Sequence, residues 1–244
     1  MRPIGRLRDA REEQAIMTEL DLLSRLLHRD GLMLVVDKPA GLPVHRGPKG
    51  GDNLEDHFDQ LRFGLPRAPA LAHRLDKDTS GCLVLGRHRK ALERLGKLFK
   101  SGRIQKTYWA VVEGAPEGES GEIDLALGRL DAARGWWMRV DPLGLPAQTS
   151  WRVLGRGVDT QGGDLALLEL RPHTGRTHQL RVHAQAMGWP ILGDPIYGRR
   201  PGESRPLHLH ARGVTIPMQD SKPAVVAEAP APAHMLEAMA ACGA

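Results

Sequence analysis

Short apolar runs separated by glycine, proline and charged residues recur along the whole chain, and they limit the folds it can adopt. Runs of this length that are rich in Val, Leu and Ile are typical of buried strands. They are also much too short to cross a membrane as helices. Strands are therefore expected at 32–36, 82–85, 106–113, 149–154, 165–170 and 207–216.

Two segments between these runs have helical periodicity. Residues 88–100 place apolar side chains three or four positions apart, with Lys and Arg between them. Residues 176–187 carry a stripe of Thr177, Leu180, Ala184 and Met187, and the glycine that follows suits the end of a helix. Strands of mixed length with helices between them predict an α+β domain with a mainly antiparallel or mixed central sheet and flanking helices.

The chain has 244 residues, enough for one large domain with a substantial core. We expect that domain at 28–236. Residues 1–27 are expected to form a loose N-terminal arm or a short docking helix, and 237–244 a C-terminal tail. Within the domain, 45–70 is expected to be a loop with one helical turn, and 223–233 an extended Pro-Ala arm.

The charge of the chain favours a polyanionic partner. Lys and Arg number 34 against 29 Asp and Glu, which leaves a formal net charge of +5. The basic residues gather at 87–90, 171–181 and 199–212, and three such clusters could converge on one face. Nucleic acid is therefore the first partner to consider.

Cysteine content and the N-terminus bear on the compartment. The chain has two cysteines, Cys82 and Cys242, with no CxxC pair, so neither a disulfide framework nor a thiolate zinc site is expected. No apolar signal segment opens the sequence, and no run is long enough for a membrane span. A cytoplasmic location is predicted.

Several catalytic and cofactor motifs are absent from the sequence. It contains no GxxxxGK[ST] or GxGxxG loop for a nucleotide cofactor, and no GxSxG nucleophile elbow. His178 and His183 are five residues apart, so they do not share a helix face as zinc ligands would. We expect no metal and no cofactor, and we interpret the other histidines as surface or RNA-facing groups.

One polar stretch stands out at the entrance to the expected strand 82–85. Residues 73–81 read HRLDKDTSG and place Asp76 and Asp78 among basic side chains. Asp76 could cap the Thr-Ser-Gly turn, or it could be a nucleophile positioned at the mouth of the strand. Taken singly, Arg181 could be a solvated helix residue and Tyr108 a half-buried strand residue.

Four segments taken together point to a family. They are LVVDKPAGLPVH at 34–45, AHRLDKDTSGCLVLGR at 72–87, KTYWAVVEG at 106–114 and RPHTGRTHQLRVHAQAMGWPILGDPIYG at 171–198. In this order and spacing the chain resembles the RluA-type family of pseudouridine synthases, which isomerise uridines in ribosomal or transfer RNA. The resemblance extends from about residue 28 to about residue 235.

The resemblance implies a catalytic set. By position, Asp76 is the essential catalytic carboxylate, and Arg181 forms an ion pair with it. Tyr108 stacks on the target base and can help to remove its C5 proton. The segments 82–85 and 176–187 would then form the walls of a catalytic RNA-binding cleft.

It also implies RNA contacts. Arg74 is a candidate to enter the RNA stack where the flipped uridine was, and Arg176, His178 and Gln179 are candidates for RNA binding. Lys38, in the first of the four segments, is expected to be mainly structural. The partner implied is a structured rRNA or tRNA stem-loop, and in the absence of a self-association signal the chain is predicted to be a monomer.

Two regions depart from the family pattern. Many relatives carry an N-terminal S4-type RNA-binding domain, and residues 1–27 are too short to form one. The stretch 123–145, which contains RGWWMR, follows no family pattern; its Trp136 and Trp137 could stack on bases or could cover the sheet.

The expected reaction breaks the C1′–N1 bond, turns the uracil and rejoins it through C5. Attack at C1′, addition at C6 and a glycal route are all compatible with one catalytic carboxylate. Two other functions are alternatives. An RNA N-glycosidase would cleave the same bond with Asp78 as the base for water. A catalytically silent RNA-binding protein would keep the cleft without turnover.

Overall fold

The structure is a computed structural model that describes residues 20–47, 50–131, 136–199, 205–219 and 221–244. Most of the arm expected at residues 1–27 therefore lies outside the described residues. Its last part belongs to the folded domain, because Leu22 is fully buried and a strand begins at Leu26. The expected boundary at residue 27 is thus too late.

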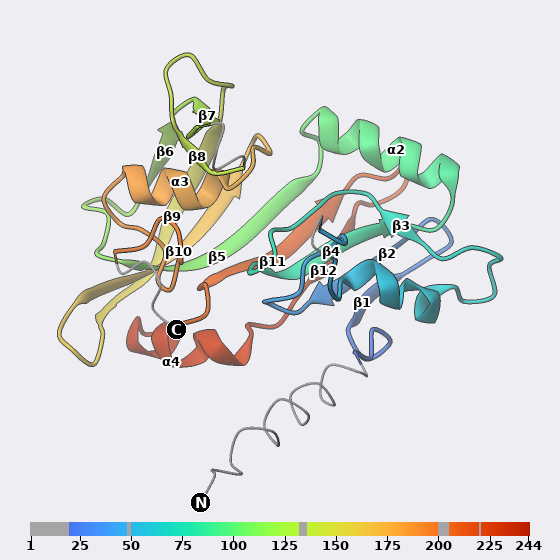
Figure 1. Cartoon of the computed structure of the whole chain (residues 1–244), viewed down its shortest axis with the longest axis horizontal. Helices are drawn as coiled ribbons and strands as arrows, with labels where there is room; N and C mark the ends of the chain where they lie inside the picture. The colour runs from blue at the N-terminus through green and yellow to red at the C-terminus, as the bar shows by residue number, and fades with distance from the viewer. Residues whose placement is uncertain (1–19, 48–49, 132–135, 200–204, 220) are drawn as a thin grey trace, which may run out of the picture.

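One mixed sheet crosses the described part of the chain (Figure 1). Its paired strands are antiparallel except β4 and β11, which are parallel, so the predicted mixed sheet is confirmed. In spatial order the strands are β1 (Leu26–Arg29), β2 (Met33–Lys38), β4 (Ser80–Gly86), β11 (Leu209–Ile216), β5 (Gln105–Glu113), β10 (Asp164–Pro172), β9 (Gln148–Val158) and β6 (Ser120–Asp124). Two short strands extend it: β3 (Ala70–Leu71) pairs with β4, and β12 (Val225–Glu228) with β11.

Helices cover both faces of this sheet. They are the 3-10 helix η1 (Leu54–Leu61) and the α-helices α2 (Arg89–Lys100), α3 (Gln179–Ala186) and α4 (Ala233–Ala241). A separate hairpin of β7 (Leu127–Arg129) and β8 (Met138–Val140) lies beside α3 (Figure 1).

The first half of the sheet is buried on both faces. Because strand side chains alternate between the faces, Met33 and Val35 of β2 pack into the cluster of α2, whereas Leu34 and Val36 pack into the cluster of η1. This explains why β2 and β4 are continuous apolar runs rather than alternating ones.

The second half is built in the same way with different helices. Ala110 of β5 packs into the cluster of α3, and Val111 into the cluster of α4. Tyr108 of β5 contacts both the η1 cluster and the α3 cluster. The layers of η1 and α3 therefore lie on the same face, and Tyr108 is where they meet.

The two halves are joined through the short parallel pairing of β4 with β11. Ser80 and Gly81 lie beside His210 and Ala211, and a bond between Ser80 Oγ and His210 Nδ1 of 2.9 Å reinforces the junction. Gly81 has φ of +102°, and a Cβ there would collide with the carbonyl oxygen of Ala211. The Thr-Ser-Gly step is therefore needed for the close approach of these strands.

The helix expected at 176–187 is shorter than the sequence suggests. It begins at Gln179, and both Thr177 and Met187 of the expected apolar stripe are exposed. Leu180 and Ala184 are buried as expected. The predicted stop is also correct, because Gly188 adopts φ of +85° directly after the helix.

The C-terminal expectations are wrong. Part of the expected Pro-Ala arm is β12, which pairs with β11. The expected tail 237–244 includes the end of α4, where Met239 and Cys242 are buried against the sheet. Apolar Ala and Met residues with few charges gave no clear amphipathic signal there, and tertiary packing decided the outcome.

Two histidines also differ from their predicted exposure. His208 and His210 are buried, and each one bonds to a partner inside the protein. The interpretation of these residues as surface or RNA-facing groups is therefore wrong.

Candidate active site

An open cleft with a volume of about 810 Å³ lies on the face that carries η1 and α3. One side, here called the Asp76 wall, consists of residues 43–45, 73–77 and 79. The other, the Arg181 wall, consists of residues 172–181 together with Asp194 and Tyr197 behind them. Tyr108 and Leu209 line the cleft from the central strands. The loop before β4 thus forms the wall that was expected of strand 82–85.

Asp76 lies on its wall with its carboxylate partly exposed. One third of the side chain (33%) is open to solvent, and the turn is closed by the Thr79 amide, which donates to the Asp76 carbonyl at 3.2 Å. Among the described residues that line the cleft, Asp76 is the only carboxylate, since Asp78 does not line it. A substrate in the cleft can therefore reach this one acid directly.

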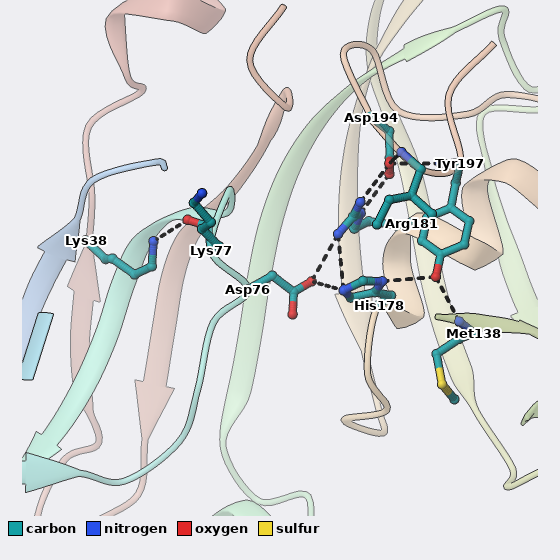
Figure 2. A network of polar contacts seen from close by, with 9 residues as sticks. Lys38, Asp76, Lys77, Met138, His178, Arg181, Asp194 and Tyr197 are labelled. Atoms are coloured by element: carbon teal, nitrogen blue, oxygen red, sulfur yellow. Dashed lines mark hydrogen bonds and ion pairs between the residues drawn. The ribbon is translucent and has the colours of Figure 1, made fainter. Parts of the chain in front are cut away.

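Lys38 anchors the same loop through the backbone of Lys77 (Figure 2). Its side chain is fully buried, and its Nζ donates to the carbonyl of Lys77 at 2.8 Å and to the carbonyl of Pro39 at 2.7 Å. Burial lowers the pKa of Lys38 to about 7, although the nearby carboxylates of Asp78 and Asp76 oppose the shift. Lys38 thus positions the backbone next to Asp76, as its expected structural role implies.

Arg181 faces Asp76 across the cleft, but its closest partner is Asp194. Arg181 Nη1 is 3.8 Å from Asp76 Oδ2, whereas Nε and Nη2 each donate to an oxygen of Asp194 at 2.7 Å. This bidentate pair is almost completely buried, with 3% and 0% of the side chains exposed. The predicted ion pair with Asp76 is present at long range, and a much tighter one lies behind it (Figure 2).

The charges of this buried pair are well compensated. Burial alone would raise the pKa of Asp194, but the hydrogen bonds and charge of Arg181 outweigh it and hold the pKa below its usual value. The backbone amides of Ile196 and Tyr197 add two further donors. For Arg181, burial is likewise opposed by Asp194, and the pKa rises above its ordinary value. The guanidinium is therefore a permanent cation in a fixed orientation.

His178, a predicted RNA contact, belongs to the Arg181 wall, and both nitrogens of its ring lie close to groups of the protein. It is buried, with its Nε2 at 3.3 Å from Arg181 Nη1 and 3.7 Å from Asp76 Oδ2. Burial lowers its pKa; Asp76 opposes this shift and Arg181 adds to it. Because Arg181 can only donate, Nε2 of the neutral ring accepts and the proton lies on Nδ1, which donates to Tyr197 Oη at 3.0 Å. Arg181 therefore remains the cation that faces Asp76.

The backbone of His178 sets the direction of its ring. The residue precedes α3 and adopts φ of 51° and ψ of 19°, in the left-handed region that residues with a side chain seldom adopt. Such a conformation is typically retained where surrounding contacts hold it. Here those contacts are the bonds to Tyr197 and Arg181.

Tyr108 lies half-buried on β5 and lines the cleft, as the resemblance implies. Burial raises its pKa, and the charge of Asp76 raises it further. The hydroxyl therefore stays protonated near neutral pH. Its ring can support a planar base, but a phenolate is not available to remove a proton.

The remaining predicted RNA contacts have different surroundings. Arg74 is exposed, and both it and Arg176 line the cleft. Arg176 Nε donates to the carbonyl of Pro146 at 3.0 Å, which holds its stem on the cleft rim. Both arginines remain candidates for contact with phosphate or base.

Gln179 is committed to the protein itself. Its Nε2 donates to Gln148 O at 2.8 Å and to Thr149 Oγ1 at 3.0 Å. Its Oε1 accepts from Thr174 Oγ1 at 2.7 Å and from Arg176 N at 3.0 Å. The four bonds use the full capacity of the amide, so the predicted RNA contact has no free group and Gln179 instead shapes the loop before α3.

Asp194 and Tyr197 are the site residues that the sequence reasoning missed. Both belong to the segment GDPIYG, which was part of the resemblance but received no role. An aspartate and a tyrosine in a turn-rich loop have many ordinary explanations, so the segment alone could not reveal that it packs behind Arg181.

No helix in the described residues is long and apolar enough to cross a membrane. The described residues also contain no cluster of three or more His, Cys, Asp or Glu that could hold a metal ion.

The fold and the cleft together define the class of protein. The structure is similar to the solved structures of human RNA pseudouridylate synthase domain containing 1 and domain containing 4, with TM-scores of 0.72 and 0.74. The first is 31% identical, and the match covers 89% of this chain and 86% of the human chain. The second is 27% identical, and the match covers 97% of this chain and 98% of the human chain. The architecture is that of a pseudouridine synthase.

The family follows from the sequence comparisons. Residues 32–186 match the model of the family described as RNA pseudouridylate synthase. An uncharacterized RNA pseudouridine synthase of Zymomonas mobilis is 43% identical over 214 residues, covering 86% of this chain and 95% of that protein. Ribosomal large subunit pseudouridine synthase C of Vibrio cholerae is 34% identical, covering 88% and 68%. The chain belongs to the RNA pseudouridylate synthase family, and it is an isomerase that acts on RNA.

Proposed function

We propose that this enzyme converts specific uridines of structured rRNA or tRNA to pseudouridine, with Asp76 as its catalytic carboxylate. The observation that carries the proposal is the position of Asp76. It is the only acid among the described cleft residues, partly open to a substrate and opposed by the fixed guanidinium of Arg181. A cytoplasmic location and a monomeric state remain predictions within this proposal.

The reaction makes simple demands on the protein. The C1′–N1 bond breaks, a C1′–C5 bond forms, one proton leaves C5 and one proton joins N1, so that water is not consumed and no electrons are exchanged. A carboxylate near the sugar–base junction can add to the substrate or assist departure of the uracil. Asp76 is accessible enough for either step.

Arg181 supplies the electrostatic support for that carboxylate. Two opposite charges ~4 Å apart attract by about 4 kcal/mol at an effective dielectric of ~20. Solvent at the partly exposed Asp76 reduces this attraction. It is weaker than the attraction between Arg181 and Asp194, because the two bonds to Asp194 are shorter. Arg181 thus places a positive charge beside the Asp76 carboxylate without closing a tight bond over the oxygen that must react.

A uridine within an RNA stem-loop must leave its stack before Asp76 can reach it, at a cost of a few kcal/mol. Tyr108, half-buried on the floor of the cleft, supports the uracil by stacking. Arg74 is exposed on the Asp76 wall and fills the vacated position in the RNA. Since Tyr108 stays protonated, we assign it stacking and not base catalysis through a phenolate.

The geometry disfavours hydrolysis of the same bond. An N-glycosidase with Asp78 as a second carboxylate would need both acids in the cleft, separated by room for a water. Asp78 does not line the cleft, and its charge instead acts on buried Lys38.

The direct test is carbodiimide-based mapping of pseudouridine in ribosomal and transfer RNA. Cells that lack this gene would be compared with the same cells carrying the wild-type gene or the Asp76→Asn variant. We expect one or a few sites to disappear on deletion, to return with the wild type and to stay absent with the variant. Restoration by Asp76→Asn would refute the assignment of Asp76.

A further inference from the structure

Trp136 has an unusual position for a large aromatic side chain. It lines the cleft, and 57% of it is exposed to solvent. A tryptophan that served only to cover the sheet would be mostly buried, as Trp189 is at 4% exposure. The exposed indole is therefore available for contact with whatever enters the cleft.

The protein holds this indole next to the catalytic groups. Its ring meets the ring of His178 edge to face, with centroids 5.0 Å apart and an interplanar angle of 77°. His178 in turn lies 3.7 Å from Asp76. Trp136 is thus one aromatic ring away from the carboxylate.

The hairpin that carries Trp136 is fastened to the Arg181 wall. The Met138 amide of β8 donates to Tyr197 Oη at 2.9 Å, and that same hydroxyl bonds His178 (Figure 2). Val182 of α3 is buried in a cluster with Leu127 and Ala147. The indole is therefore presented from a docked element.

The surroundings of the indole suit RNA. Arg74, Lys77 and Lys100 are exposed and line the same cleft, so the cleft combines exposed cations with an exposed aromatic ring. Cationic grooves with exposed aromatic rings bind single-stranded nucleic acid: the cations contact phosphates and the rings stack on bases. A protein partner would not specifically require this combination.

We propose that Trp136 is a second stacking platform, which holds an unpaired base next to the flipped uridine in the RNA. The inference rests on the proposed function, since it presumes that a uridine occupies the space at Asp76 and Tyr108. In this proposal Trp136 contributes to substrate binding and to the choice of RNA loop, and Asp76 carries out the chemical step.

The test separates stacking from charge. Binding would be measured in the Asp76→Asn background, so that no turnover occurs, with two probes: a ten-residue oligouridylate, and a decamer of abasic ribose phosphates with the same charge. Stacking on one base is worth a roughly 5- to 150-fold change in Kd. We expect Trp136→Ala to weaken binding of the oligouridylate by such a factor, Trp136→Phe to weaken it less, and neither to change binding of the abasic decamer.

Trp137→Ala is the matched control: the Trp137 ring meets that of Trp136 edge to face, with centroids 6.1 Å apart, but Trp137 does not itself line the cleft, so the variant shows whether removing a neighbouring ring alone affects binding. We expect it to bind both probes as the parent does. Equal affinity of the parent for the two probes, undetectable binding included, would overturn the inference. So would an unchanged Kd in Trp136→Ala, or an equal loss on both probes.

The outcome is distinguishable from failure of the proposed function. If deletion of the gene removes no pseudouridine site, the proposed function fails whatever Trp136 does. If sites are lost and restored by the wild type while Trp136→Ala retains base-dependent binding, only the stacking inference fails.

Discussion

Asp76 and Arg181 face each other with opposite charges, and the two walls of the cleft hold them in opposite ways. On the Arg181 wall, guanidinium and carboxylate are buried and joined by two bonds of 2.7 Å. On the Asp76 wall, the carboxylate is one third exposed, and the loop is held through backbone carbonyls that accept from Lys38. One wall fixes a side chain, and the other fixes a backbone and leaves its side chain accessible.

This difference suits a group that must react. A carboxylate held by short hydrogen bonds is a poor nucleophile, and a cation that had to be ordered during the reaction would cost reorganisation energy. Asp194 keeps Arg181 ordered in advance, while the distance of 3.8 Å leaves Asp76 free to contact a substrate. The two carboxylates near Arg181 therefore have separate tasks.

The largest expected effect is the loss of turnover when the reactive carboxylate of Asp76 is removed. Asp76→Asn should lower turnover at least about 10⁴-fold, because the amide lacks the reactive anion. Single-turnover assays on the RNA identified by mapping would measure it, with unchanged thermal unfolding as the check on folding. Asp78→Asn is the control and should stay within roughly tenfold of the wild type; an equal loss in both variants would show that the two acids act together.

Asp194→Asn tests the buried wall. It leaves the buried guanidinium of Arg181 with only the partly exposed Asp76, 3.8 Å away, as a counter-ion, which should reduce the free energy of unfolding by about 3–5 kcal/mol. Urea denaturation followed by circular dichroism would measure the change.

The matched control is Glu228→Gln. It breaks the ion pair between Glu228 and Arg212, whose charged atoms are 2.6 Å apart and whose Glu228 side chain is exposed to solvent. An exposed pair contributes about 1 kcal/mol or less. Equal losses in the two variants would contradict the view that burial of the Arg181–Asp194 pair makes it important.

Arg181→Lys keeps the charge and removes the planar fork. A lysine cannot make the bidentate contact with Asp194 while also facing Asp76. We expect turnover to fall about 10²- to 10³-fold, the range seen when one preorganised donor is removed, with a smaller change in KM. Turnover like that of the wild type would refute the electrostatic role of Arg181.

The smallest effect concerns Lys38 and pH. Its pKa in the folded protein is about 7, against an ordinary value of 10.5. Between these values the unfolded chain holds a proton that the folded chain has lost, so the free energy of unfolding should rise with pH in this window. Below pH 7 the cost of burying the charge is present in full.

Lys38→Met lacks this titration and provides the comparison. The difference in free energy of unfolding, wild type minus variant, should increase between pH 7 and pH 9 in urea denaturation. A difference that stays constant or falls with pH would show that Lys38 titrates normally in the folded protein.

Much of the fold could be predicted because its signals are local. The apolar runs at 32–36 and 82–85 became β2 and β4, and the periodic segment 88–100 became α2, whose Ala91 and Leu95 are buried. The C-terminal helix α4 could not be predicted, because its Ala- and Met-rich sequence becomes helical against the sheet and has no distinct polar face.

The candidate site divides in the same way. Asp76, Tyr108 and Arg181 were found from the sequence because each belongs to a specific motif, and the structure brings all three to one cleft. Gln179 was misinterpreted because a glutamine beside an arginine looks available until its four internal bonds are known.

By itself, the sequence determined which residues carry the chemistry and which segments form most of the sheet, since motif spacing and apolar periodicity are properties of neighbours along the chain. Only the tertiary structure decided how those residues are supported. Asp194 lies 13 positions from Arg181, and Lys38 lies 39 from the Lys77 carbonyl that it binds. Burial and hydrogen bonding between distant segments exist only once the sheet and its helices have closed around the cleft.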